Sequence, residues 1–371
     1  MRFGLVIYGS LDTVSGGYLY DRQLVDYLQR QGDSVEVISL PWRNYARHLG
    51  DNRSAGLLRR LGGDFDVLLQ DELNHPSLAW ANGRFARRAP IVAIVHHLRA
   101  SEVRPGWQNA AYRAIERRYL RSVNGFIFNS VATRAAVAAL IGQARPSIVA
   151  YPGGDRLAGL EPIATAATGR PPRKPASEPL RLLFVGNLIS RKGLLSLLAA
   201  LGRLPEVNWR LTVVGRAADE RYARQAQQMA ARLPASRVIW RGRLDDAALA
   251  VELGAADVLV VPSSYEGFGI VYIEGMAFGL PAIATTAGGA GEIVTDGVDG
   301  FLVPPGDVAA LAERIARLAA DPALLDRMSD AARRRYARHP TWAQTAAAAR
   351  QFLIEVAGPS SAGDTPATFP N

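Results

Sequence analysis

Short apolar runs alternate with longer amphipathic segments along almost the whole chain, and this alternation limits the fold more than any other feature. Amphipathic segments such as Tyr18–Arg30 and Ala110–Arg121 separate the runs of the first half. Such runs are typical of strands buried on both faces, and strands that alternate with helices form a parallel sheet. The first half therefore predicts a doubly wound α/β sheet. Its expected strands are Phe3–Tyr8, Val35–Leu40, Val67–Leu69, Ile91–Val95, Phe126–Phe128 and Ile148–Ala150.

The alternation stops and then restarts. Residues 156–179 contain the stretch GRPPRKPASEP, which predicts an exposed linker. Strand-like runs then resume at Leu180–Val185, Leu211–Val214, Val238–Trp240, Val258–Val261, Ala282–Thr285 and Phe301–Val303. The helical patterns between them cover Leu194–Leu201, Glu220–Arg232, Ile270–Phe278, Ala309–Ala319 and Leu324–Arg338. We therefore expect two similar α/β domains, at residues 1–155 and 180–340.

The two ends of the chain and its composition limit the class of protein to which it can belong. A last helix is expected at Trp342–Val356, within residues 341–357, and residues 358–371 lack an apolar period and are expected to be disordered. No run of about 18 apolar residues is present, so no spanning helix is expected. MRFGLVIYGSLD is interpreted as a first strand and not as a signal peptide. The absence of cysteine excludes disulfides, thiolate metal sites and a cysteine nucleophile, and fits a cytoplasmic location.

The net charge of +9 belongs almost entirely to the first half. Residues 1–178 hold 23 Lys+Arg and 15 Asp+Glu, whereas residues 179–371 hold 20 and 19. This basic surface suits an acidic acceptor or the anionic headgroups of a membrane, and the alternative is a solvated arginine-rich surface. No nucleic-acid partner is expected, since zinc-finger spacing and RNP-like motifs are absent. The basic stretches contain Arg43, Arg47, Arg53, Arg59, Arg60, Arg84, Arg87, Arg88, Arg99, Arg104, Arg113, Arg117, Arg118 and Arg121.

The loops after the first strand of each half have the composition of phosphate sites. The loop GSLDTVSGG at residues 9–17 lets backbone N–H groups approach an anion, although a plain strand-to-helix turn fits equally. The loop FVGNLISRKG at residues 184–193 brings Arg191 and Lys192 to a helix start, where they can neutralise a diphosphate. A solvated charge pair is the alternative. Lys192 is one of only two lysines, which favours a functional role.

Carboxylates and histidines follow other strands. Glu266 and Glu274 bracket the segment EGFGIVYIE, and a carboxylate can accept hydrogen bonds from vicinal hydroxyls of a ribose or hexose, although helical carboxylates usually face water. His96 and His97 end one strand, and Asp71 and Glu72 end its neighbour. Open α/β sheets bind ligands at the carboxyl ends of their strands. These groups are therefore candidate site residues.

Three segments together resemble the retaining glycosyltransferases of family 4: SRKG at residues 190–193, EGFGIVYIE at 266–274 and GGAGEIVTDGVDGFLVPPGD at 288–307. Glu266 and Glu274 match that family's E-x7-E motif, and YPGGD at residues 151–155 is similar to its P-x-G-x-D. The resemblance covers about residues 1–357. It implies the GT-B fold, in which two facing Rossmann-like domains flank a deep inter-domain cleft and the C-terminal helix returns to the N-terminal domain.

The resemblance also implies an activity. Family members move a hexose-type sugar from a nucleoside-diphosphate sugar, here a UDP- or GDP-sugar, to a hydroxyl acceptor such as a lipid, polysaccharide or small polyol. They retain the anomeric configuration and need neither a metal nor another cofactor. The acceptor binds mainly to the first domain and the donor to the second. Because the first half of the chain is basic, a peripheral place on the inner face of the cell membrane is expected beside a cytoplasmic one.

Site residues follow from the resemblance, position by position. Arg191 and Lys192 resemble the diphosphate clamp, Glu274 the ribose ligand and Glu266 the group at the transferred sugar. The expected catalytic residues are His96, Arg191, Lys192 and Glu266. The expected donor-binding residues add Gly16, Gly17, Gly186, Arg241, Gly242, Leu244, Gly267, Phe268, Gly269, Ile270 and Glu274. The acceptor side departs from the family pattern, and Asp71, Glu72, His97 and Arg99 are its candidate residues.

Two other readings stay open at this point. A nucleotide-sugar epimerase can share the two-domain fold, and product analysis with and without an acceptor would separate it from a transferase. A non-catalytic nucleotide-sugar-binding subunit is the third reading. A subunit that has lost catalysis is not expected to keep a complete donor site. The presence of all four residues therefore argues against this hypothesis: Arg191, Lys192, Glu266 and Glu274.

Overall fold

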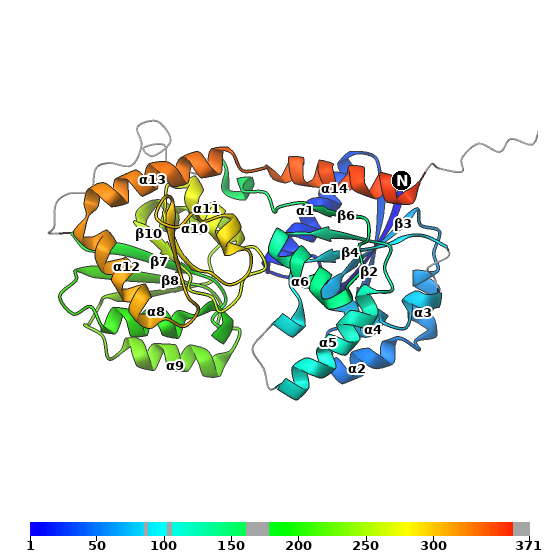
Figure 1. Cartoon of the computed structure of the whole chain (residues 1–371), viewed down its shortest axis with the longest axis horizontal. Helices are drawn as coiled ribbons and strands as arrows, with labels where there is room; N and C mark the ends of the chain where they lie inside the picture. The colour runs from blue at the N-terminus through cyan, green and yellow to red at the C-terminus, as the bar shows by residue number, and fades with distance from the viewer. Residues whose placement is uncertain (85–87, 102–105, 161–177, 359–371) are drawn as a thin grey trace, which may run out of the picture.

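The structure is a computed structural model that describes residues 1–84, 88–101, 106–160 and 178–358 (Figure 1). Arg87 and Arg104 of the basic stretches lie outside the described residues, as do most of the expected linker and the expected disordered tail. The described residues form two α/β halves, each built around one parallel sheet. The predicted doubly wound, two-domain architecture is confirmed.

The first sheet has the strand order β2-β1-β3-β4-β5-β6, and every neighbouring pair is parallel. The chain builds outward from β1 to β2, then crosses to the other side of β1 and adds the remaining strands in order. The strands are β1 (Arg2–Tyr8), β2 (Ser34–Leu40), β3 (Val67–Asp71), β4 (Ile91–Val95), β5 (Gly125–Phe128) and β6 (Ser147–Val149).

The second sheet repeats this plan with the order β12-β11-β10-β7-β8-β9. Here the chain builds from β7 through β8 to β9, and β10 then returns to the other side of β7. The strands are β7 (Leu180–Val185), β8 (Trp209–Val214), β9 (Val238–Gly242), β10 (Val258–Val260), β11 (Ala282–Thr285) and β12 (Gly300–Val303).

Helices cover both sheets. Several begin at a residue whose side chain accepts a backbone N–H, among them Ser15 before α1 and Ser130 before α6, which explains where these helices start. The helices of the first half are α1 (Gly16–Arg30), α2 (Tyr45–Asp51), α3 (Ala55–Leu61), α4 (His75–Leu78), α5 (Gly106–Leu120) and α6 (Val131–Ile141). The later ones are α8 (Leu194–Gly202), α9 (Glu220–Ala230), α10 (Asp246–Ala255), α11 (Ile270–Ala277), α12 (Val308–Ala320), α13 (Pro322–Ala337) and α14 (Trp342–Ala357).

The last helix packs against the first half of the chain. Figure 1 shows α13 and α14 running along one edge of the molecule, with α14 beside α1. Alternate β1 side chains face opposite sides of the sheet, and Phe3 and Leu5 share a core with Phe352 and Leu353 of α14. The C-terminal helix therefore completes the core of the N-terminal domain. In the part of the chain that the structure describes, no helix is both long and apolar enough to cross a membrane.

Candidate functional site

Each sheet has one point where its strand order reverses, and the candidate residues gather there. In the first sheet this point lies between β1 and β3, and in the second it lies between β7 and β10. Crevices form at the carboxyl ends of strands at such points, and open α/β folds bind ligands in them. The loop at residues 9–17 leaves β1, and the loops carrying Lys192 and Glu266 leave β7 and β10.

Glu266 is the centre of a charged group in the second domain. Its carboxylate forms an ion pair with Lys192 Nζ, lies 3.6 Å from Arg191 Nη1, and accepts a hydrogen bond of 2.7 Å from Ser263 Oγ. Burial alone would raise the pKa of Glu266, but Lys192 and Arg191 outweigh it and lower the pKa. Two cations against one carboxylate leave a net positive charge, as a diphosphate site requires.

Two glycines make this arrangement fit. Gly193 follows the short helix η5 (Ser190–Lys192) with φ +74°, and a Cβ there would overlap the carbonyl oxygen of Pro262. Gly269 has φ +100° directly before α11, beside the Tyr272 ring. The absence of a side chain at Gly193 lets the loop after β7 pack against the loop after β10, and its absence at Gly269 leaves room for the Tyr272 ring of α11.

Glu274 lies in α11 and is 5% exposed. Its Oε1 accepts a hydrogen bond of 2.6 Å from Nε of Arg156, which also pairs with Asp246. Burial raises the pKa of Glu274, and Arg156 opposes that rise. Arg156 belongs to η4 (Asp155–Leu157), where the sequence analysis expected linker, so it is an unforeseen partner for an expected donor residue.

Expected donor residues from both domains meet at one interface. A Cβ at Gly267 would overlap the carbonyl oxygen of His96, and a Cβ at Gly17 would lie 3.0 Å from the His96 ring. A Cβ at Gly16 would lie 3.4 Å from Ile270 of the second domain. His96 and its neighbouring glycines therefore form a close backbone contact between the domains.

Side chains reinforce this interface. The Glu292 carboxylate accepts the backbone N–H groups of Val131 and Ala132, at 2.8 and 2.7 Å, and so caps α6 from the opposite domain. Asn129 donates to the His96 carbonyl at 2.8 Å. None of these contacts has a local sequence signal, because the partners are distant along the chain.

His96 lies between two buried carboxylates of the first domain. Its Nε2 is 3.1 Å from Oδ1 of Asp21, which projects from α1 and is fully buried. Burial alone would lower the pKa of His96, but the charge and hydrogen bond of Asp21, with the charges of Asp71 and Glu72, raise it overall. Burial and the nearby Asp21 raise the pKa of Asp71 to about 7. The sequence analysis did not identify Asp21.

The other acceptor-side candidates separate into different surroundings. Glu72 pairs with His75 at 3.1 Å, and the Arg99 guanidinium lies 5.2 Å from the Tyr45 ring and 4.8 Å from the Tyr112 ring. The His97 ring lies 5.5 Å from that of Tyr265, across the domain interface. The structure thus brings Asp71 to His96, Glu72 to His75, and Arg99 to two tyrosines.

The remaining donor candidates lie in different parts of the second domain, some buried and some at the sheet edge. Gly186 ends β7 beside the Lys192 side chain, and buried Phe268 packs near the rings of Tyr151 and His339. Arg241 and Gly242 end β9 at the sheet edge, Leu244 follows, and Arg241 pairs with Glu252 at 2.8 Å. No described contact joins these last three to Glu266.

Two described groups of side chains have donors that a divalent ion can use. One is Asp21, Asp71 and His96, and the other is Glu72, His75 and Glu116. In both, ion pairs between the imidazole and a carboxylate account for the grouping. An Asp-x-Asp sequence at residues 64–66 precedes β3 at the far end of the sheet, where its carboxylates contact Arg2. It therefore lies away from the candidate site.

Comparisons with known proteins identify the family of this chain. Residues 15–154 match the family model described as Glycosyl transferase 4-like domain, and residues 168–335 match Glycosyl transferases group 1. Glycogen synthase of Mycobacterium tuberculosis H37Rv is 31% identical over 313 residues, which are 81% of this chain and 72% of the relative. Phosphatidyl-myo-inositol mannosyltransferase of Mycobacterium leprae is 28% identical over 355 residues, 88% of this chain and 90% of the relative.

Solved structures share the fold. A sucrose-phosphate synthase from Thermosynechococcus elongatus gives a TM-score of 0.79 at 23% identity, over 96% of this chain and 98% of that one. The Anabaena protein HepE, solved with UDP and glucose, gives 0.73 at 21% identity, over 95% and 99%. Both family models and the relatives agree with the resemblance found in the sequence. The chain belongs to the family 4 glycosyltransferases and is a transferase with the two-domain GT-B fold.

Proposed function

We propose that this enzyme transfers a hexose-type sugar from a UDP- or GDP-sugar to a hydroxyl acceptor. The observation that carries the proposal is the group of Arg191, Lys192 and Glu266 at the reversal point of the second sheet. Support comes from HepE, which binds UDP-glucose, and from relatives whose names include phosphatidyl-myo-inositol mannosyltransferase and D-inositol 3-phosphate glycosyltransferase. The donor is assigned to residues 180–340 and the acceptor mainly to residues 1–155.

The proposed chemistry follows from charge. As the bond between sugar and phosphate breaks, negative charge grows on the diphosphate, and Arg191 and Lys192 stabilise it without reorganising. Lys192 is held beside Glu266, so an arriving diphosphate competes with that carboxylate for the ammonium group. We propose that these cations take the role of a metal, that the donor-side Glu274 binds the ribose, and that no other cofactor is needed.

We propose that the configuration at the sugar is retained through attack from the side of the leaving group, whose phosphate takes the acceptor's proton. Glu266 is engaged by Lys192, Arg191 and Ser263, which suits a positioning role more than that of a covalent nucleophile. His96 lies at the domain interface and its raised pKa favours an imidazolium, which adds positive charge near the reacting sugar.

Lys192→Ala tests the proposal directly. Removing one such group costs transition-state stabilisation of roughly 3–4 kcal/mol, so we expect transfer to fall roughly 100- to 1000-fold. Product analysis with a panel of nucleotide sugars, with and without acceptor, also separates transfer from epimerisation and from binding alone. Arg224→Ala, on exposed α9, is the matched loss of a cation and should leave the rate unchanged. Full activity in well-folded Lys192→Ala would refute the donor-site assignment.

A peripheral location on the inner face of the cell membrane is also proposed. It is supported by the charge of the first domain and by the exposed Trp80 and Trp107, since arginine and tryptophan favour the membrane interface. The proposal predicts that the protein floats with anionic vesicles and is released by salt. Equal flotation with neutral vesicles would count against it.

A further inference from the structure

A groove on the first domain, which we name the arginine groove, is not part of the donor site. It has a volume of about 810 Å³ and lies between the end of β2 and helices α2 and α3. Four arginines line it, together with one acidic side chain, Asp51. The arginines are Arg43, Arg47, Arg59 and Arg60, all from the first basic stretch of the sequence.

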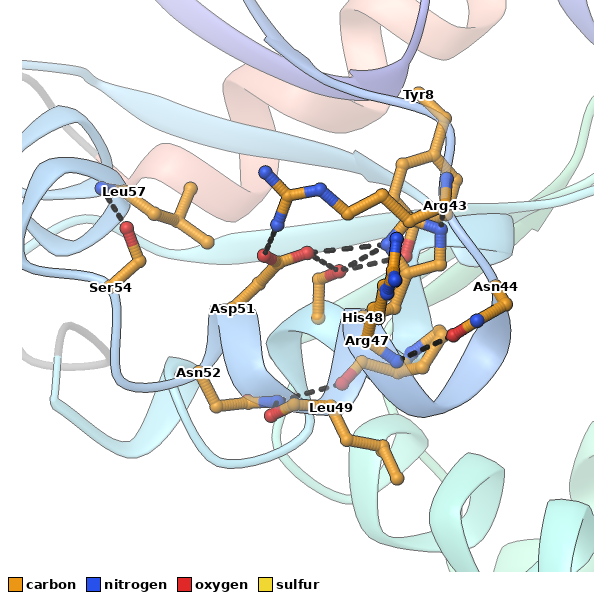
Figure 2. A network of polar contacts seen from close by, with 12 residues as sticks. Tyr8, Arg43, Asn44, Arg47, His48, Leu49, Asp51, Asn52, Ser54 and Leu57 are labelled. Atoms are coloured by element: carbon orange, nitrogen blue, oxygen red, sulfur yellow. Dashed lines mark hydrogen bonds and ion pairs between the residues drawn. The ribbon is translucent and has the colours of Figure 1, made fainter.

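Asp51 offsets the charge of only one groove arginine, because its carboxylate is paired with Arg43. Figure 2 shows its carboxylate among Arg43 and His48, and it accepts hydrogen bonds from Arg43 at 3.0 Å and Ser77 at 2.8 Å. His48 Nδ1 lies 3.2 Å from the same carboxylate. Asp51 is 7% exposed and therefore holds Arg43 from the buried side of the groove lining.

Of the other arginines, Arg60 is held by backbone carbonyls, whereas Arg47 and Arg59 are available to bind a ligand. Arg60 donates to the backbone carbonyls of Ser39 and Val37 along the edge of β2, at 3.2 and 3.3 Å. Arg47 and Arg59 are exposed, and neither has an acidic partner in the part of the chain that the structure describes. The lining thus carries an excess of three positive charges, which favours an anion. Arginine suits a phosphate best, because its planar guanidinium can bind two phosphate oxygens at once.

A second cavity adjoins the groove and shares Arg43 with it. This aromatic cavity has a volume of about 580 Å³, and its lining includes Tyr8, Trp42, Tyr45 and Tyr112. Tyr8 ends β1 at the reversal point of the first sheet, so the cavity opens at the edge of the sheet that also carries His96. The two spaces therefore meet at Arg43.

We propose that the arginine groove binds the phosphate of a phosphorylated acceptor, whose hydroxyl-bearing part lies in the aromatic cavity. This inference rests on the proposed glycosyl transfer and adds the acceptor's class and binding place. The phosphate belongs either to a soluble phosphomonoester or to the phosphodiester of a lipid headgroup. Both sources present the same anionic oxygens to Arg47 and Arg59.

The test compares Arg47→Gln/Arg59→Gln with Arg221→Gln/Arg224→Gln, which removes two exposed arginines of α9. Inorganic phosphate is titrated against each full-length protein by calorimetry, in buffers matched for ionic strength with chloride. We expect wild type and the α9 variant to bind equally, and the groove variant to bind at least about tenfold more weakly. Unchanged binding of UDP by the groove variant establishes that its fold is intact. Equal phosphate binding by all three proteins overturns the proposal.

A second arm identifies the source of the phosphate. The same proteins are sedimented with vesicles of phosphatidylcholine alone or of equimolar phosphatidylcholine and phosphatidylglycerol. Anionic-vesicle binding that depends on Arg47 and Arg59 assigns the groove to a lipid phosphodiester. Phosphate binding without vesicle binding assigns it to a soluble phosphomonoester. Wild type that binds neither probe overturns the proposal.

A transfer assay distinguishes failure of this inference from failure of the proposed glycosyl transfer on which it rests. With acceptor pairs that differ only in a phosphate, the groove variant should raise KM for the phosphorylated member at least about tenfold and leave its partner unaffected. An equal change for both members overturns the acceptor assignment. If wild type binds phosphate through the groove but transfers sugar to no acceptor, the proposed function fails while the anion site stands.

Discussion

Asp21 contacts the His96 imidazole from inside α1, and this contact is the largest of those that favour the charged form of the histidine. Burial disfavours the imidazolium, whereas the Asp21 carboxylate 3.1 Å away favours it. The largest of the charges that favour the imidazolium therefore comes from a side chain that lies 75 residues away in the sequence.

Asp21→Asn should lower the pKa of His96, because the largest charge that favours the imidazolium is removed. The measurement is an NMR titration of the imidazole in the variant and the wild type. Asp26→Asn, an exposed carboxylate on the same helix, provides the matched control and should not move the titration. An unchanged midpoint in Asp21→Asn would show that Asp21 does not set the charge.

Glu116 predicts a pH dependence of stability. Its carboxylate accepts the backbone N–H groups of Arg99 and Ala100, yet burial raises its pKa to about 8. The folded state therefore binds more protons than the unfolded state between the ordinary pKa and about 8, and the free energy of unfolding falls as the pH rises through that window. Below the window this contribution is fully present.

Glu116→Gln removes the titrating group and should flatten the decline. Urea unfolding, measured at intervals from about pH 5 to about pH 8.5, gives the free energy of unfolding for each protein. Exposed Glu355→Gln should keep the wild-type slope. Parallel slopes in Glu116→Gln and wild type would contradict the assignment.

Among the elements, α14 has the clearest contribution to stability, because it covers one face of the first sheet. Phe352 is 7% exposed and packs beside Gly125 of β5, where a Cβ would lie 3.2 Å from the ring. Phe352→Ala should cost about 3–5 kcal/mol of stability in the N-terminal domain. Denaturant unfolding followed by the fluorescence of that domain measures it.

The neighbouring Gln351→Ala is the control, because Gln351 is exposed on the same helix. Its free energy of unfolding should stay within about 0.5 kcal/mol of wild type. A loss as large as that of Phe352→Ala would point to an effect on helix propensity and not on the core.

Most elements were predictable from sequence because their patterns are local. Long apolar runs such as β1 and β4 and the strongly amphipathic α9 and α12 were recognised within a few residues of their observed ends. Helix α10 was not, because its apolar and charged residues do not alternate with a clear helical period. The seven-residue helices α2 and α3 depend on tertiary packing for their stability, so the sequence offered little signal for them.

The candidate site residues also divide into those that have a local sequence signal and those that have none. Arg191, Lys192 and Glu266 stand in recognisable motifs, and the structure brings them together. Asp21 and Arg156 have no motif, since each matters only through a partner 75 or 118 residues away. Single-sequence reasoning has no means of pairing such residues, because long-range contacts leave no local periodicity.

For the whole molecule, the contact between Gly267 and the His96 carbonyl decides whether the two domains can meet. A side chain at Gly267 would occupy the same space as that oxygen. Gly267→Ala should therefore hold the domains apart and lower transfer by more than tenfold, while nucleotide affinity changes less. Small-angle scattering should show a larger radius of gyration for the variant.

Gly291→Ala is the control for this prediction. A Cβ at Gly291 would meet only Leu302, at an ordinary 3.6 Å. Both the scattering curve and the transfer rate should match wild type. An unchanged radius of gyration in Gly267→Ala would contradict the prediction, because it would show that the interface accommodates the added methyl group while the domains stay in contact.

The place of α14 has a consequence for synthesis. Domains that are translated first usually begin to fold first, while later residues are still being added. Here Trp342, Ala349 and Leu353 belong to the same core as Phe3 and Leu5, so strand β1 waits for a helix that is translated more than 300 residues later. On the ribosome the N-terminal half must therefore keep an apolar sheet face uncovered until α14 has emerged, and a nascent chain stalled before residue 342 should be a strong client for chaperones.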